Sequence, residues 1–159
     1  MTRAQTTTEL DIGDRQTLVA ARGDDASEVQ VVLSIGAHHL ADDIFRHDPP
    51  TPAELEAAID VVEDQVMTAV DIVTAGSSLV VLGSFAAQIA QACGADGPGS
   101  ATVDLETIEG LFQRLASESL GNPAARRGLP AGNAFVAGVL ILREFMHHHG
   151  FGSITIDVH

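Results

Sequence analysis

The segment Ser78–Cys93, with the sequence SLVVLGSFAAQIAQAC, constrains the fold more than any other part of this chain. Its first five residues form an uncharged apolar run, which is typical of a strand buried on both faces. Gly83 interrupts the run, and Ser84 can then cap a helix through its hydroxyl group. The pattern predicts a strand, a glycine turn and a helix N-terminus, an arrangement that can hold a phosphate or a nucleotide.

The composition argues against several classes of protein. A chain of 159 residues suits one domain, and with 45% hydrophobic but only 4% aromatic residues its core consists of Ala, Val, Ile and Leu. The formal net charge of −14 argues against partners such as nucleic acid or an anionic membrane. No apolar run has the length of a membrane span, and the N-terminus lacks a signal-peptide pattern. The single cysteine, Cys93, fits a reducing compartment, so we expect a cytoplasmic protein.

Alternating apolar residues predict strands at both ends of the chain. We expect residues 1–8 to be flexible and residues 9–159 to form a single domain. Residues 9–21 predict two antiparallel strands joined at Gly13-Asp14, and residues 28–35 predict a third strand. Residues 153–156 predict the last strand.

Helical periodicity and capping signals predict most of the remaining elements. A short helix is expected over residues 37–45, and Thr51, Pro52 and Glu54 form a strong start signal for a longer one. Residues 94–104 predict a loop whose last residues cap the next helix, and residues 133–149 predict a long apolar helix. The order predicts an α/β fold, with helices packed on a mixed five-stranded sheet, βββ-α-β-α-β.

Several short stretches occur in the order found in one known family. They are Asp11-Ile12-Gly13, residues 33–40, residues 47–55, Leu82-Gly83-Ser84, residues 132–138 and Ile154-Thr155-Ile156. Together they resemble the second half of the exopolyphosphatase and guanosine pentaphosphate phosphatase (Ppx/GppA) family, in the actin-like ATPase superfamily. The resemblance implies a ribonuclease-H-like half-domain over nearly the whole chain. It also implies a set of candidate phosphate-binding residues, Asp11, Gly13, Thr17, Gly83 and Ser84, with Mg²⁺ at Asp11 if the chain is catalytic.

The departures from that family pattern weaken the implied activity. The family's glycine-rich hairpin, D-I-G-G-G-S-T-E, brings backbone amides to phosphate, whereas here Asp14 follows Gly13 and adds a negative charge. The arginine and aspartate of the family's R-A-D-V-I segment fall at Ala131 and Asn133. The family's catalytic acid and first phosphate loop belong to its other half, of which this chain holds no copy.

Histidines and strand-end carboxylates are the candidate metal ligands. His147, His148 and His149 are consecutive, and neighbouring side chains on a helix point roughly 100° apart, so at most two could share an ion without help. The alternative is a polar helix C-terminus, where imidazoles interact favourably with the helix dipole. Other residues could complete a site, namely His38, His39, His47 and His159. Asp11 and Asp157 could also pair at adjacent strand ends and bind Mg²⁺.

Two hypotheses for the function follow. The first is a degenerate Ppx/GppA-like domain that is non-catalytic alone and acts as a binding or assembly module. An isolated half-domain exposes the face that its missing half would cover, which favours a homodimer or a partner protein. The alternative is an exopolyphosphatase or guanosine pentaphosphate phosphohydrolase, a phosphoric anhydride hydrolase that works as a homodimer or with a separate first-half chain.

Overall fold

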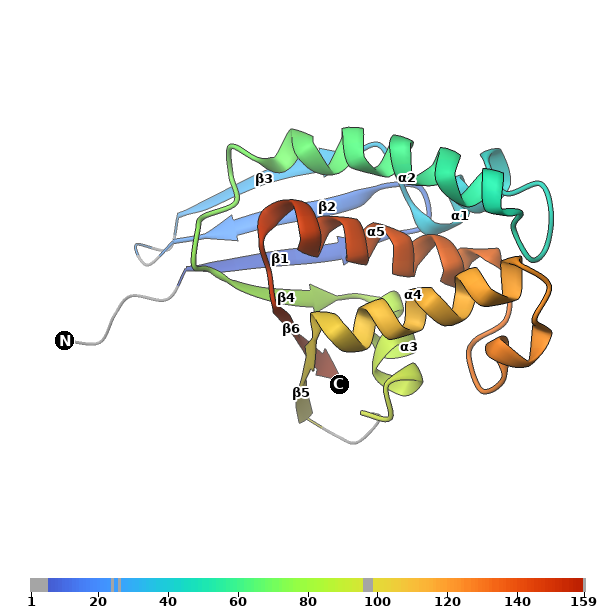
Figure 1. The fold of residues 1–159 in the computed structure, drawn as a ribbon. Helices are drawn as coiled ribbons and strands as arrows, with labels where there is room; N and C mark the ends of the chain where they lie inside the picture. Colours follow the sequence, from blue (N-terminus) through green and yellow to red (C-terminus); the bar gives the residue numbers. More distant parts are fainter. Residues whose placement is uncertain (1–5, 24, 26, 96–98, 159) are drawn as a thin grey trace.

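A six-stranded mixed sheet forms one layer of the molecule (Figure 1). The structure is a computed structural model that describes residues 6–23, 25, 27–95 and 99–158. The strand order is β3-β2-β1-β4-β6-β5, with β4 parallel to β1 and β6 and the other pairs antiparallel. The strands are β1 (Thr7–Ile12), β2 (Thr17–Arg22), β3 (Glu28–Leu33), β4 (Ser78–Leu82), β5 (Gly99–Asp104) and β6 (Ser153–Val158). The predicted mixed α/β fold is confirmed.

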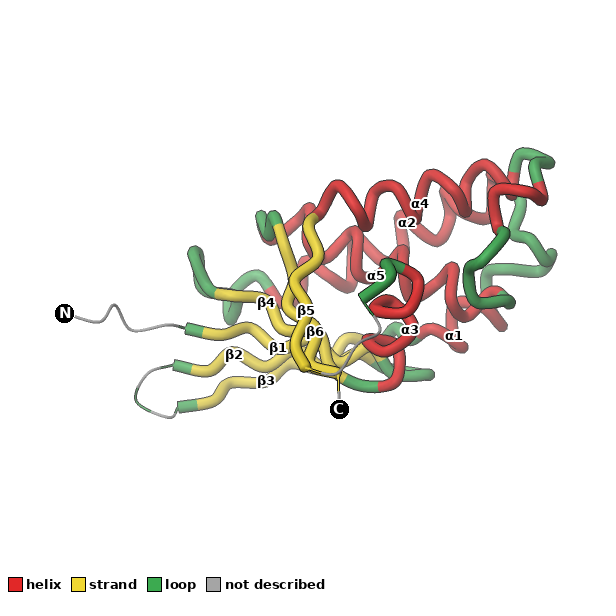
Figure 2. The backbone as a smooth tube through the Cα atoms, turned by 90° about the horizontal axis from the view of Figure 1, so that it is seen from below, coloured by secondary structure: helices red, strands yellow, loops and turns green. Residues whose placement is uncertain are grey.

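The helices gather on one side of this sheet (Figure 2). They are α1 (Ala37–Asp43), α2 (Pro52–Val66), α3 (Ser84–Ala92), α4 (Leu105–Ser119) and α5 (Asn133–His149), with short 3-10 turns at Met67–Ala69 and Pro123–Arg126. The connections from β3 to β4 and from β4 to β6 join parallel strands and advance in the same direction across the sheet. Such crossovers are right-handed in nearly all proteins. They therefore place their helices over the same face, and β1 shows the result, because Leu10 and Ile12 are buried while Asp11 between them is half-buried.

Helix α5 is the centre of the core, and α1, α2 and α4 all pack against it. Its residues from Phe135 to Leu142 are all buried, including Gly138. The ring of Phe85 on α3 lies directly against Gly138, where a Cβ atom would overlap the ring. The glycine inside this helix is therefore required by the close approach of α3.

The sheet contains one strand more than the five predicted. Residues 99–104 were expected to form a loop, but they form β5 and pair antiparallel with β6 along its full length. Only Val103 of this strand is buried, so β5 has the weak apolar pattern of an edge strand. Asp104 then caps α4 by accepting a hydrogen bond from the backbone N–H of Thr107, at 2.8 Å, as one of the two predicted caps.

Two details of the segment Ser78–Cys93 differ from the prediction. Strand β4 is buried on one face only, because Val80 and Leu82 point to the sheet face that no helix of the described residues covers. Ser84 does not cap α3, because Gly83 occupies the N-cap position with φ +89° and no side-chain hydrogen bond is made there. An L-residue rarely adopts that backbone conformation, which explains the glycine.

The remaining boundaries are close to those predicted. The capping box at the start of α2 is confirmed, with Thr51 and Glu54 each accepting a hydrogen bond from the other's backbone N–H. Strand β1 begins at Thr7, so the last two residues of the expected flexible N-terminus belong to the sheet, and residues 1–5 lie outside the described residues. None of the helices described is long and apolar enough to cross a membrane.

Candidate functional site

A shallow pocket lies at the end of the sheet where β1 turns into β2. It has a volume of about 110 Å³, and the first residues of α1, α3 and α5 meet around it. Its lining residues are Ile12, Asp14, Ala37, His38, Ser84, Phe85, Gln88 and Ala134. Helix N-termini carry free N–H groups and a partial positive charge, so this end of the molecule is the one suited to an anion.

Only two of the three helix N-termini remain open. Helix α1 uses its first amides to hold the hairpin turn, since Ala37 and His39 donate to the carbonyl oxygens of Gly13 and Asp14, each at 2.9 Å. Helices α3 and α5 begin after Gly83 and Gly132, and neither has a side-chain cap. Their first N–H groups are therefore the better donors for a ligand.

Asp11 and Gly83 form the closest contact between the predicted phosphate-binding residues. The Oδ1 atom of Asp11 lies so near Gly83 that a Cβ atom there would overlap it. The two residues are brought together because Asp11 on β1 pairs with Leu82 on β4, one residue before the glycine. Ser84 follows as the first residue of α3 and lines the pocket.

The other two predicted phosphate-binding residues have structural contacts. Gly13 closes the hairpin turn by donating its N–H to the carbonyl oxygen of Gln16 at 3.0 Å. Thr17 is fully buried, and its hydroxyl donates to the carbonyl oxygen of Ile35 at 2.9 Å. The structure thus brings Asp11, Gly83 and Ser84 together and uses Thr17 to hold the end of β3.

The charge of the pocket is unfavourable for phosphate. None of its described lining residues is Lys or Arg, and it contains the carboxylate of Asp14. Nε2 of His38 lies 3.6 Å from Oδ1 of Asp14, and among the described lining residues His38 is the only basic side chain. The hairpin therefore presents a carboxylate where the Ppx/GppA pattern has glycine.

The prediction that Asp11 and Asp157 lie at adjacent strand ends is wrong. Strand β4 lies between β1 and β6, so the two residues belong to strands that do not touch. Strands in a sheet are spaced by about 4.8 Å, which places the two backbones roughly 10 Å apart. The sequence could not exclude the pair because it does not give the strand order.

Asn133, which stands where the family pattern has aspartate, anchors the start of α5. Its Nδ2 donates to the carbonyl oxygen of His47 at 2.8 Å, which ties the loop before α2 to this helix. Its Oδ1 is buried and has no hydrogen-bond partner among the residues that the structure describes. The residue therefore links two segments beside the pocket.

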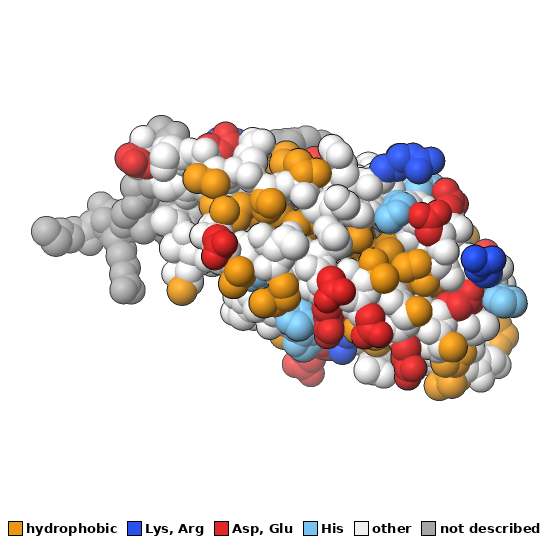
Figure 3. Space-filling view, turned by 90° about the horizontal axis from the view of Figure 1, so that it is seen from above, with side chains coloured by type: hydrophobic (Ala, Val, Ile, Leu, Met, Phe, Trp, Pro, Cys, Tyr) orange, Lys and Arg blue, Asp and Glu red, His pale blue; other side chains and the backbone are white. Residues whose placement is uncertain are grey.

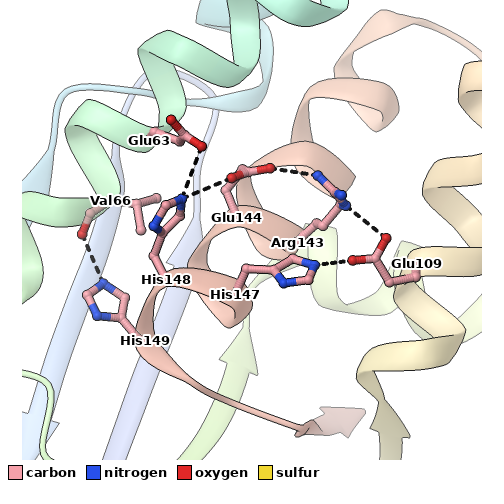
Figure 4. Close-up of polar contacts among 8 residues, drawn as sticks. All are labelled: Glu63, Val66, Glu109, Arg143, Glu144, His147, His148 and His149. Atoms are coloured by element: carbon pink, nitrogen blue, oxygen red, sulfur yellow. Dashed lines mark hydrogen bonds and ion pairs between the residues drawn. The ribbon is translucent and has the colours of Figure 1, made fainter.

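The three consecutive histidines each point to different partners at the other end of α5 (Figure 4). His147 contacts Glu109 on α4, His148 lies between Glu63 on α2 and Glu144, and Nε2 of His149 donates to the carbonyl oxygen of Val66 at 2.9 Å. No two of them share a contact group, in agreement with the expected divergence along a helix. The three histidines therefore do not converge on one common site.

Burial and hydrogen bonds shift the pKa values at this end. Burial lowers the pKa of His149 and outweighs its hydrogen bond to Val66. Partial burial raises the pKa of Glu109. Hydrogen bonds from His147 and Arg143 lower it by more than burial raises it, so the net shift is downward. Sequence reasoning did not single out Glu63, Glu109, Arg143 or Glu144. Only the i, i+4 spacing of Glu144 and His148 could have pointed to them.

The remaining candidate residues have local partners. Nε2 of His39 lies 2.8 Å from a carboxylate oxygen of Asp43, and Nδ1 of His47 lies 3.2 Å from Glu54. His159 lies outside the described residues. Cys93 is half-buried, and burial together with the nearby Asp104 raises the pKa of its thiol, which disfavours the reactive thiolate.

Comparison with known proteins identifies the fold. No protein-family model matches the sequence, and no curated protein matches it either. The structure of the Aquifex aeolicus PPX-GPPA enzyme is similar over 99% of this chain, with a TM-score of 0.75 and 16% sequence identity. An exopolyphosphatase from Cytophaga hutchinsonii is similar over 98% of this chain, with a TM-score of 0.67 and 14% identity.

The similarity ends at about half the length of these proteins. This chain covers 55% of the Aquifex aeolicus protein and 54% of the Cytophaga hutchinsonii protein. An exopolyphosphatase-like protein gives the same result, with 95% of this chain matching 55% of that one at a TM-score of 0.70 and 17% identity. The predicted half-domain is confirmed at the level of the fold: this chain has the fold of about half of a Ppx/GppA phosphatase.

Proposed function

We propose that this chain is a binding and assembly module built on half of the Ppx/GppA fold, without catalytic activity as a single copy. The observation that carries this proposal is the charge of the pocket at the helix N-termini. Its described lining residues include Asp14 but neither Lys nor Arg. Phosphoryl transfer depends on cations and amides that stabilise the anionic oxygens, so a single copy lacks the main requirement for it.

The geometry of the hairpin supports the same proposal. Because the N–H of Gly13 donates to Gln16, this amide cannot also donate to a phosphate. The turn is pressed against the start of α1, where a Cβ atom on Gly36 would overlap the backbone of Asp14 and Arg15. A turn held in this way supports the α1 interface rather than a ligand.

The uncovered face of the sheet is the proposed surface for assembly. The apolar side chains on this face are Leu18, Val32, Val80 and Leu82, and Val32 is 50% exposed. No helix of the described part of the chain covers it (Figure 2). We propose that a second copy or a partner protein packs there, since a sheet face with apolar rows is normally buried.

The surface charge and Cys93 bear on partners and location. On the opposite, α2 side, acidic side chains alternate with hydrophobic ones (Figure 3). Val61, Met67 and Val70, in and just after α2, are exposed. The net charge of −14 favours a protein partner over nucleic acid or an anionic membrane. The single free thiol favours the cytoplasm as the site of action.

One observation favours the alternative, a phosphohydrolase completed by a second chain. Asp11 is packed against Gly83 beside the uncapped N-terminus of α3, so a carboxylate and free amides lie next to each other. A carboxylate in this position would hold Mg²⁺ against a phosphate bound by the amides. The missing positive charges would then come from a second copy or from a separate first-half chain.

The test is phosphate release from polyphosphate and from guanosine pentaphosphate with added Mg²⁺, measured together with the molar mass in solution. We expect a dimer or larger assembly that releases no phosphate. Release that disappears in Asp11→Asn but persists in Glu9→Gln would overturn the proposal and establish the alternative. Glu9 is the matched control, because it lies on the same strand and the same sheet face as Asp11, two residues away.

A further inference from the structure

Three potential metal ligands converge at the end of α5 that the proposed function does not use. They are Glu63 on α2 and the pair Glu144 and His148 on α5 (Figure 4). One ligand atom from each residue lies within 4.8 Å of the other two. Two helices that are far apart in the sequence therefore place two carboxylates and one imidazole around a common point.

The distances around His148 are close to those of a metal site. Its Nε2 lies 3.3 Å from Oε1 of Glu63 and 3.2 Å from Oε2 of Glu144. Zinc bonds of about 2.0–2.2 Å at tetrahedral angles place neighbouring donor atoms about 3.4 Å apart. Small side-chain shifts would thus let a cation bind between these three donor atoms.

Arg143 fixes the orientation of the central ligand. Its guanidinium donates to Oε1 of Glu144 at 2.7 Å and to Oε2 of Glu109 at 3.0 Å. Glu144 is 96% buried, since only 4% of it is exposed, and its Oε2 is left to face His148. Hydrogen bonds of this kind, made to the second oxygen of a ligand, hold metal ligands in place.

The surroundings favour a cation in two further ways. Glu63 lies in the last turn of α2 and His148 in the last turn of α5, so both helices direct the negative ends of their dipoles toward the site. The side chain of Glu63 is 43% exposed, which leaves room for an ion to enter and for water to complete its coordination.

We propose that Glu63, Glu144 and His148 form a binding site for a divalent transition-metal ion, with Zn²⁺ as the best match. Two carboxylates and one imidazole are ligands that zinc accepts, and a fourth position open to water suits its tetrahedral geometry. The site is separate from the pocket at the helix N-termini, so it does not depend on the proposed function. His147 and His149 take no part in it, because each is held by a different partner.

Calorimetric titration of the whole chain with ZnCl₂ alone, near neutral pH, tests the proposal. We expect one site with a dissociation constant on the order of 10 μM or tighter. In Glu63→Gln and in His148→Gln the affinity should fall about tenfold or more, because even a lost outer-shell contact has an effect of that size. His147→Gln and Cys93→Ser are the matched controls and should bind as the unmodified chain does.

Two further measurements keep the test independent of folding defects. About a hundredfold excess of Zn²⁺ over the dissociation constant should raise the melting temperature by roughly 5 °C or more, and Glu63→Gln should lose this rise. Co²⁺ should give the intense visible absorption of a tetrahedral site. No binding below millimolar concentration, or equal losses in His147→Gln and His148→Gln, would overturn the proposal.

Discussion

The two ends of helix α5 differ in how they are held and in what they can bind. At the N-terminal end Gly132 leaves the first amides uncapped, and the ring of Phe135 packs near that of Phe85, with the ring centroids 6.1 Å apart. At the C-terminal end the contacts are charged and involve histidine, arginine and glutamate from three helices. One helix dipole thus favours an anion at one end and a cation at the other.

The comparison also shows how the negative net charge affects ligand binding at each end of α5. A surplus of negative charge opposes phosphate binding at the N-terminal end, where Asp14 lines the pocket. The same surplus is compatible with the C-terminal end, because a cation is stabilised there by Glu63 and Glu144. The net charge of −14 therefore favours binding of a cation at the C-terminal end of α5 over binding of an anion in the pocket.

The largest expected loss of stability comes from removing the ring of Phe85, at the N-terminal end of α5. Phe85→Ala should lower the free energy of unfolding by about 3–5 kcal/mol, because the ring fills the space against Gly138 and Phe135. Urea denaturation measures the change. Leu120→Ala is the control, since this side chain is 77% exposed, and it should change stability by less than about 0.5 kcal/mol. Similar losses in the two variants would contradict the packing described for α3 and α5.

Breaking the charged end should have a smaller effect. Glu144→Ala removes a buried carboxylate that accepts a hydrogen bond from Arg143, and leaves that guanidinium with its hydrogen bond to Glu109. The expected loss is about 2–3 kcal/mol in urea denaturation with a chelator present. Glu63→Ala, at the exposed side of the same cluster, should cost no more than about 1 kcal/mol. Equal losses in the two variants would contradict the expectation that the buried Glu144 contributes more to stability than the more exposed Glu63.

A pH titration tests the contribution of the Glu54 carboxylate at the start of α2. The backbone N–H of Thr51 donates to Glu54 and, with weaker contributions from Arg46 and His47, lowers the pKa of Glu54 from 4.5 to about 2. A carboxyl group whose pKa is lowered by folding stabilises the protein above pH 4.5, and this contribution is lost as the pH falls toward 2. As the pH falls from 4.5 toward 2, the free energy of unfolding should decrease less in Glu54→Gln than in the unmodified chain. Parallel curves for the two proteins would disprove the role of the capping box.

The smallest expected effect concerns His149 at the other end. Burial lowers its pKa below the ordinary 6.5, so the folded state favours the neutral imidazole. Since the unfolded chain then binds more protons, stability should fall as the pH drops through 6.5. The pH dependence of the unfolding free energy between pH 7.5 and 5.5, compared with that of His149→Gln, measures this contribution. A steeper fall in the variant would show that the sign is wrong.

Local signals in the sequence were sufficient for most of the secondary structure. Thr51, Pro52 and Glu54 start α2 as predicted, because a capping box needs only residues within one turn. The order of elements and the short family motifs were also sufficient for the half-domain fold. Strand β5 was missed because an edge strand has one buried residue, Val103, and too weak an alternation to separate it from a loop.

The candidate sites could be predicted only in part. Asp11 and Gly83 were predicted from family motifs and do meet, whereas the buried hydroxyl of Thr17 shows that a motif position does not guarantee access to a ligand. The histidine triplet drew attention to the C-terminal end of α5, where charged side chains from three helices meet. Its partners Glu63 and Glu109 lie on other helices, so no spacing in the sequence connects them to His147 or His148.

By itself, the sequence determined most of the elements, their order and the residues that a helix or a turn requires, such as Gly83 and Gly150 at helix ends. Only the tertiary structure decided that every helix lies on one sheet face, and which carboxylate each histidine meets. The physical reason is the separation of the interacting groups along the sequence, because caps, turns and periodicity depend on groups only a few residues apart. Contacts such as that between Glu63 and His148 exist only after α2 and α5 have packed together.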